Sequence, residues 1–202
     1  AGDLLGGEQS GHIAAVGFDL YSQLLADAVE IRRASREGRE PARRRTAALI
    51  DLPVSAHLAD TYVADEGQRL DLYRRLGIAD SDATINAIAE ELRDRFGAPP
   101  AEAERLLEVA RLRAGASEAG LTSLLIEEGR LIVRLGELQP GLAARALVAN
   151  PIPALSMSGS QIRSRERVSG AEAWRLAARL VQGIVAEVRR WEATNAAGAP
   201  LA

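Results

Sequence analysis

The stretch TSLLIEEGRLIVRL, residues 122–135, breaks the helical spacing of apolar residues that comes before it. Two short apolar runs flank Glu128-Gly129, which is typical of a β-hairpin that turns at these two residues. A second stretch, ALSMSGSQIRSR at 154–165, predicts another hairpin that turns at Gly159-Ser160. The two hairpins predict a small antiparallel sheet in the second half of the chain.

Helical spacing of apolar residues precedes the first hairpin. It predicts helices over 65–77, 82–96 and 100–118. The short apolar run TAALIDLPV at 46–54, stopped by a proline, predicts one strand before these helices. PGLAARALVAN at 140–150 predicts a short helix between the hairpins.

A last helix is predicted over 170–192, starting at the capping box Ser169-x-x-Glu172. Its expected buried face contains five residues: Trp174, Ala178, Val181, Val185 and Val188. Because helices and strands do not alternate one for one, the pattern predicts an α+β fold. Its first half is mostly helical, and its second half has the small antiparallel sheet and the long C-terminal helix.

Composition excludes several classes of active site. All 25 basic residues are arginine, so a phosphate loop that ends in Gly-Lys-Ser/Thr and a lysine Schiff base are both impossible here. Without cysteine, and with only His12 and His57, we expect no metal site and a reducing, cytoplasmic setting. No apolar run is long enough to predict a contact with the membrane interior.

The segment before residue 46 combines a predicted helix over 12–34 with an arginine-rich linker. Residues 32–45 hold seven arginines and two glutamates. Arg43, Arg44 and Arg45 are possible phosphate contacts, although a solvated connector explains the same composition.

Three stretches resemble the C-terminal end of the bacterial transcription-repair coupling factor (Mfd) family. They are AGDLLGGEQSGHIAAVGFDLY at 1–21, YVADEGQRLDLYRRL at 62–76 and ELRDRFGAPPAEAERLLEVARLR at 91–113. The resemblance implies that the chain is a piece of a larger ATP-driven translocase on double-stranded DNA. It also implies three parts: the end of the translocase motif region with its linker (1–40), a regulatory TRCF domain (41–195) and a frayed tail (196–202).

The resemblance further implies a non-catalytic clamp. In the family, this domain packs on the UvrB-like domain of the same polypeptide, masks UvrA binding and restrains the translocase, which displaces stalled RNA polymerase. ATP and magnesium would bind in the motor domains of the parent, and this segment would hold no cofactor.

Residue roles follow from the resemblance at a few positions. Gln9, framed by Gly6 and Gly11, matches the translocation motif, but Gly7 stands where the family has an acidic residue. The arginine of that motif would precede Ala1, so we expect no translocation activity from this chain.

Glu91, Asp94 and Arg95 match the charged positions that face the UvrB-like domain. The local explanation is a helical ion pair between Glu91 and Arg95, worth about 0.2–0.5 kcal/mol.

Two other functions remain open from the sequence. A DNA-binding accessory domain would use the arginine-rich linker and Arg163–Arg167, although the net charge of −3 counts against it. A stand-alone enzyme is the least supported, because no acids or histidines cluster in a recognisable motif.

Overall fold

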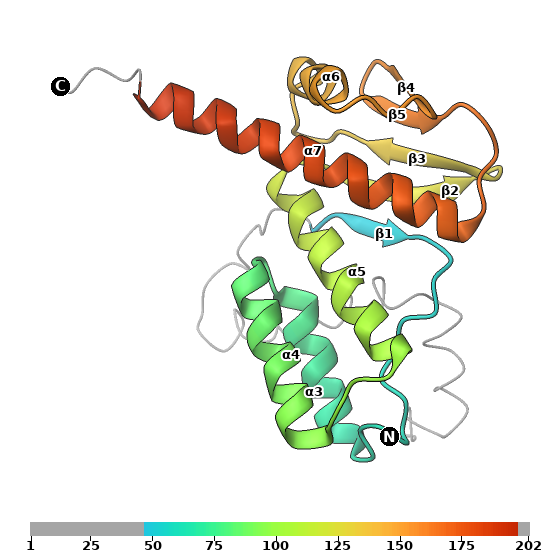
Figure 1. Cartoon of the computed structure of the whole chain (residues 1–202), viewed down its shortest axis with the longest axis vertical. Coiled ribbons are helices and arrows are strands. Elements are labelled where there is room, and N and C mark those ends of the chain that lie inside the picture. The colour runs from blue at the N-terminus through green and yellow to red at the C-terminus, as the bar shows by residue number, and fades with distance from the viewer. Residues whose placement is uncertain (1–46, 198–202) are drawn as a thin grey trace, which may run out of the picture. The chain divides into compact units, whose positions relative to one another are not determined.

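The computed structural model of this chain describes residues 47–197, which divide into two compact units. Residues 55–111 belong to the first unit, and residues 47–54 together with 112–197 belong to the second (Figure 1). The sequence-predicted sites at Gly6, Gln9, Gly11 and Arg43–Arg45, the predicted helix over 12–34 and His12 lie outside the described residues.

The first unit contains α3 (Glu66–Ile78), α4 (Asp82–Phe96) and the start of α5 (Ala101–Glu118), which confirms the three predicted helices. Their ends follow from local chemistry. The Asp65 carboxylate accepts a hydrogen bond from the Gln68 amide at 2.7 Å, and the Ser81 hydroxyl accepts one from the Thr84 amide at 3.4 Å. Gly97, with φ of 84°, ends α4 just before two prolines.

The core of the first unit is built from one face of each helix. Its largest buried members are Leu72, Leu76, Ile85, Ile88, Leu92 and Leu106. The sequence predicted Leu70, Tyr73 and Leu76 on the inner face of α3, and Leu70 is wrong because it is only half-buried. Leu72 replaces it, since it lies on the same face as Tyr73 and Leu76, about 200° around the helix from Leu70.

The second unit contains a five-stranded sheet in the order β1-β2-β3-β5-β4. The strands are β1 (Leu49–Asp51), β2 (Ser123–Glu127), β3 (Arg130–Arg134), β4 (Leu155–Ser158) and β5 (Gln161–Ser164). Both predicted hairpins are confirmed. The expectation of a purely antiparallel sheet is wrong at one edge, because β1 pairs with β2 in parallel. Three helices separate these two strands along the chain, and such a crossover connection allows parallel pairing.

The first hairpin turns where the sequence predicted. Glu128 and Gly129 both have positive φ, 52° and 77°. Positive φ at both central residues defines the type I′ turn, whose twist matches that of the flanking strands. The register therefore pairs Glu127 with Arg130 and Ser123 with Arg134.

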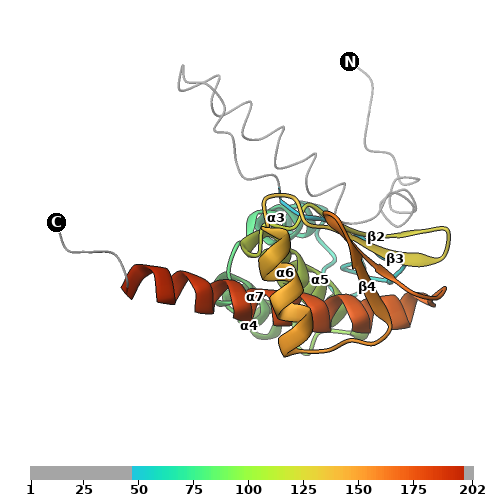
Figure 2. The same cartoon turned by 90° about the horizontal axis from the view of Figure 1, so that it is seen from above.

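The helix α7 (Gly170–Ala197) runs across the sheet, and the short α6 (Pro140–Ala149) packs beside it (Figures 1 and 2). The Ser169 hydroxyl accepts a hydrogen bond from the Glu172 amide at 3.3 Å, as the capping box predicts. Among the described residues, no helix is long and apolar enough to span a membrane. The helix continues past the predicted end at 192 into the segment expected to fray, and residues 198–202 lie outside the described range.

The buried face of α7 differs from the expected one. Val181 and Val188 are buried as predicted, but Trp174, Ala178 and Val185 are only half-buried. The centre of the face is instead formed by Ala173, Ala177, Leu180 and Ile184. These residues follow the helical period one position before the predicted set, and the two small alanines let the helix axis lie close to its neighbours. Trp191 is 37% exposed.

Gly136 supports a tight junction after β3, and its replacement gives a first prediction. Its φ is 57°, and an added Cβ would lie 2.5 Å from the Thr122 Cγ2 and 2.7 Å from the Gly120 carbonyl oxygen. We expect Gly136→Ala to lower the free energy of unfolding in urea by about 2–4 kcal/mol, from backbone strain plus overpacking.

Gly159→Ala is the matched control, because Gly159 has φ of 58° but nothing within 4 Å of an added Cβ. It should cost about 1 kcal/mol, the strain alone. Equal losses in the two variants would contradict the close approach at Gly136.

Candidate functional site

Glu91 on α4 lies at the centre of a charged cluster. Its Oε2 lies 2.6 Å from the Arg75 Nη2, and its Oε1 lies 2.5 Å from the Arg95 Nη1. Arg75 belongs to α3, so the carboxylate joins two helices of the first unit. With Gln68, these residues form what we call the Glu91 cluster. The Glu91 side chain at its centre is 25% exposed, so this ion pair is less accessible to solvent than an ordinary surface ion pair.

The contact between Glu91 and Arg75 favours the charged form of both side chains. The hydrogen bond from Arg75 lowers the pKa of the Glu91 carboxyl below its ordinary value, and it outweighs the partial burial that acts in the opposite direction. The same hydrogen bond raises the pKa of Arg75. Glu91 therefore has its two carboxylate oxygens occupied inside this unit.

Arg95 is held in place on several sides and still reaches solvent. Its Nη2 donates to the Gln68 Oε1 at 3.0 Å, and its guanidinium carbon lies 5.0 Å from the centre of the Phe96 ring. Phe96 in turn meets Tyr62 edge to face, with ring centres 6.0 Å apart. The Arg95 side chain is 46% exposed, so an oriented cation faces outward.

Asp94 contrasts with its neighbours. It is exposed, and among residues 47–197 no hydrogen bond or ion pair engages its carboxylate. Of the three residues singled out from the sequence, Glu91 is thus committed inside the unit, whereas Asp94 and Arg95 remain available to a partner. The predicted Glu91–Arg95 pair is present.

Sequence reasoning missed Arg75 and Gln68. Both lie within the stretch YVADEGQRLDLYRRL, and the spacing of Asp71 and Arg75 marks a charged helical face. In the structure the Asp71 carboxylate lies 3.7 Å from the Arg75 Nη1. The spacing of Asp71 and Arg75 was the signal in the sequence for a charged face of α3. The packing of α3 against α4 decided that Glu91 contacts Arg75 on that face.

Metal-binding residue types do not gather in the described part of the chain. Within residues 47–197, no three side chains of the His, Cys, Asp or Glu type lie together in a way that would hold a metal ion. His57 is half-buried between β1 and α3.

Comparisons with known proteins agree with one another. The sequence profile of the TRCF domain family matches residues 52–143. The transcription-repair-coupling factor of Mycobacterium bovis is 41% identical over 190 residues, which cover 83% of this chain and 15% of that protein. The factor of Haemophilus influenzae is 44% identical over 116 residues, which cover 56% of this chain and 10% of that protein. The chain therefore spans only 15% of the length of the first relative and 10% of the second.

A solved structure shares the fold. The crystal structure of the C-terminal domain of a transcription-repair coupling factor superposes with a TM-score of 0.60 and 17% sequence identity. The match covers 70% of this chain and 93% of that one. At this identity the likeness concerns the fold alone.

The pKa of Glu91 predicts a pH-dependent contribution to stability. Because the folded pKa lies below that of the unfolded chain, the ionised carboxylate stabilises the fold above about pH 4.5, and this stabilisation is lost as the pH falls. Glu91→Gln should lower the free energy of unfolding by about 0.5–1 kcal/mol at pH 7. The difference from the unmodified chain should decline as the pH falls from about 5 towards 2.

Glu90→Gln is the control, because Glu90 is exposed on the same helix and has no ion pair among the described residues. Urea titrations across the pH series measure both variants. A Glu91→Gln deficit that stays constant with pH would refute the ion-pair origin.

Proposed function

Because this chain belongs to the TRCF-domain family of the transcription-repair coupling factors, we propose that residues 41–195 form the regulatory domain of such a factor. The domain packs on the UvrB-like domain of the same polypeptide, covers its UvrA-binding surface and restrains the DNA translocase. The chain acts here as a binding surface and supplies no group to the chemical step.

The observation that carries this proposal is the arrangement of Asp94 and Arg95. The two exposed charges of opposite sign are neighbours on α4, and the Glu91 cluster holds the guanidinium of Arg95 in one orientation. A long side chain that is already ordered loses less conformational entropy when it binds, by about 0.5–1.5 kcal/mol. A partner with one guanidinium and one carboxylate at matching positions satisfies both charges.

Restraint of the translocase is a shift between a closed and an open state. The domain favours the closed state only by the difference in its affinity for the two. UvrA, RNA polymerase and double-stranded DNA are then reached through the parent protein, in which ATP and magnesium bind at the motor domains. Loss of the contact made by Asp94 and Arg95 releases the UvrA-binding surface.

Isothermal titration calorimetry of this chain against the excised UvrB-like domain of the same factor tests the proposal. We expect binding in the micromolar range or tighter. Asp94→Ala and Arg95→Ala should each weaken the dissociation constant by roughly tenfold or more, about 1.4 kcal/mol.

Arg93→Ala is the charge-matched control. Arg93 is exposed on the same helix, but it lies about 200° around the axis from Arg95 and so on the opposite flank. It should leave the affinity within about twofold of the unmodified chain. The proposal would be refuted if the titration gave no heat and if UvrA did not compete with this chain for the UvrB-like domain.

A further inference from the structure

The strand β4 is one edge of the sheet in the second unit. The hydrogen-bond pattern shows which of its groups face outward. The Leu135 amide donates to the Ser160 carbonyl oxygen at 2.9 Å. The even-numbered residues of β5 therefore direct their backbone groups towards β3, and its odd-numbered residues direct theirs towards β4. The amide of Arg165 donates to the Ala154 carbonyl oxygen at 2.8 Å, so Ser156 and Ser158 are the β4 residues that bond to β5.

Leu155 and Met157 consequently direct their backbone groups away from the sheet. The Leu155 amide is used locally, since it donates to the Ile152 carbonyl oxygen at 2.9 Å. The Met157 amide, its carbonyl and the Leu155 carbonyl are left without a partner among residues 47–197. These three outward-facing backbone groups can form hydrogen bonds with one further strand added beside β4.

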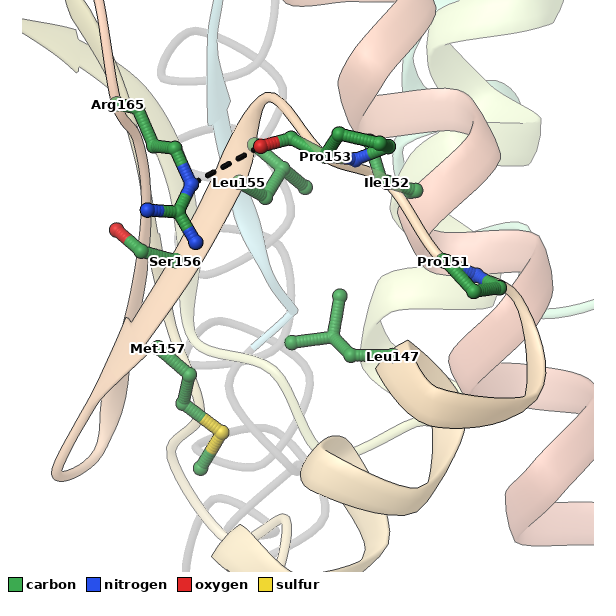
Figure 3. Close-up of a pocket in the computed structure, with 8 residues that line it drawn as sticks. All are labelled: Leu147, Pro151, Ile152, Pro153, Leu155, Ser156, Met157 and Arg165. Carbon is green, nitrogen blue, oxygen red and sulfur yellow. Dashed lines mark hydrogen bonds between the residues drawn. The ribbon is translucent and has the colours of Figure 1, made fainter.

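A hollow of about 330 Å³ lies directly beside this edge (Figure 3). Its apolar lining comes from Leu147 on α6, from Ile152 and from the β4 residues Leu155 and Met157. Figure 3 shows Leu147 and Met157 on the same side of the β4 ribbon. The hollow has room for a single apolar side chain of a strand laid along β4.

Basic side chains lie at the same edge. Arg165 and Ser156 also line the hollow, although Figure 3 draws them across the β4 ribbon from Leu147. Arg163 pairs with Ser156 in register, is exposed and has no carboxylate partner among the described residues. The Nε of Arg165 donates to the Pro153 carbonyl oxygen at 3.0 Å, which orients the guanidinium but leaves its charge uncompensated.

The wider charge balance points the same way. Residues 112–195 hold 11 arginines against eight glutamates and no aspartate. On the neighbouring strands Glu127 is already paired with Arg134 at 2.7 Å. Among the described residues, neither Arg163 nor Arg165 makes an ion pair, so their charges are available to a ligand.

We propose that β4 binds an extended peptide segment of a partner protein in which apolar and acidic residues alternate. Backbone hydrogen bonds to Met157 and Leu155 add the segment to the sheet as a sixth strand. Because successive side chains of a strand point to opposite faces, its apolar residues enter the hollow and its acidic residues meet Arg163 and Arg165. This site shares no residue with the Asp94–Arg95 surface and does not depend on the proposed clamp.

The other possible occupants fit less well. Duplex DNA would satisfy the arginines but offers neither a strand backbone for Met157 nor an apolar side chain for the hollow. A second copy of β4 would supply backbone groups, but it would place Arg163 of one copy near that of the other. Both occupants are outcomes of the test.

The test uses the whole chain and an acetylated, amidated octapeptide of alternating valine and aspartate. Binding is followed by NMR, through the backbone amide shifts of the ¹⁵N-labelled chain. We expect saturable shifts centred on Met157 and Arg163, with half-saturation below about 1 mM. The matched peptide of alternating valine and lysine should bind at least roughly tenfold more weakly.

Two substitutions at one position separate backbone pairing from side-chain contact. Met157→Ala keeps the outward amide, whereas Met157→Pro removes it without touching the bonds that Ser156 and Ser158 make to β5. Met157→Pro should bind the acidic peptide at least roughly tenfold more weakly than Met157→Ala. Arg163→Glu should weaken binding of the acidic peptide and improve binding of the lysine peptide. This test does not depend on whether the Met157→Pro variant folds. Arg175→Glu, at an exposed arginine of α7, is the control and should change neither.

Several results would overturn the proposal. They are no saturable shift up to about 1 mM peptide, equal affinity of the proline and alanine variants, or no response to Arg163→Glu. A 12-base-pair duplex that shifts the same amides more strongly than the peptide would assign the surface to DNA. Concentration-dependent dimerisation abolished by Met157→Pro would assign it to a second copy of the chain.

Discussion

The second unit depends on the parallel pairing of β1 with β2. Three residues, Leu49–Asp51, align with Ser123–Leu125, although about 70 residues separate them along the chain. The Leu49 amide donates to the Thr122 carbonyl oxygen at 3.0 Å, and the Ala48 amide donates to the Ser117 hydroxyl at 2.9 Å. This pairing closes a loop that contains α3, α4 and α5. It costs more loop-closure entropy than either hairpin, so burial of residues such as Ile50 and Leu124 must offset it.

The charged side chains of the first unit illustrate how ion pairs divide a surface into used and available groups. Glu91 is paired with two guanidiniums, and its loss would leave Arg95 without a carboxylate partner and Arg75 with Asp71 alone. Asp94, one helical turn on, has no such commitment. The charges available to a partner are therefore those that form no ion pair inside the unit. The sequence alone does not show which charged residues are paired internally and which are available.

Different elements were predictable to different degrees. The ends of α3 and α4, the start of α7 and the Glu128-Gly129 turn were predicted closely, because caps and type I′ turns depend on residues within one turn of each other. The inner faces of α3 and α7 were only partly predicted, with Leu70 and Trp174 placed too deep. Which of two nearby apolar residues is buried depends on the neighbouring element, and periodicity alone does not decide between positions one or two residues apart.

Local chemistry in the sequence by itself determined the order of helices and strands, the α+β class and the helical pair of Glu91 with Arg95. Each depends on residues close together in the chain. Only the tertiary structure decided that β1 pairs in parallel, that Arg75 reaches Glu91 and that the outward backbone groups of β4 lie beside a hollow lined by both Leu147 and Arg165. These features join segments far apart in sequence, where packing and hydrogen-bond geometry, rather than local preference, select the partner.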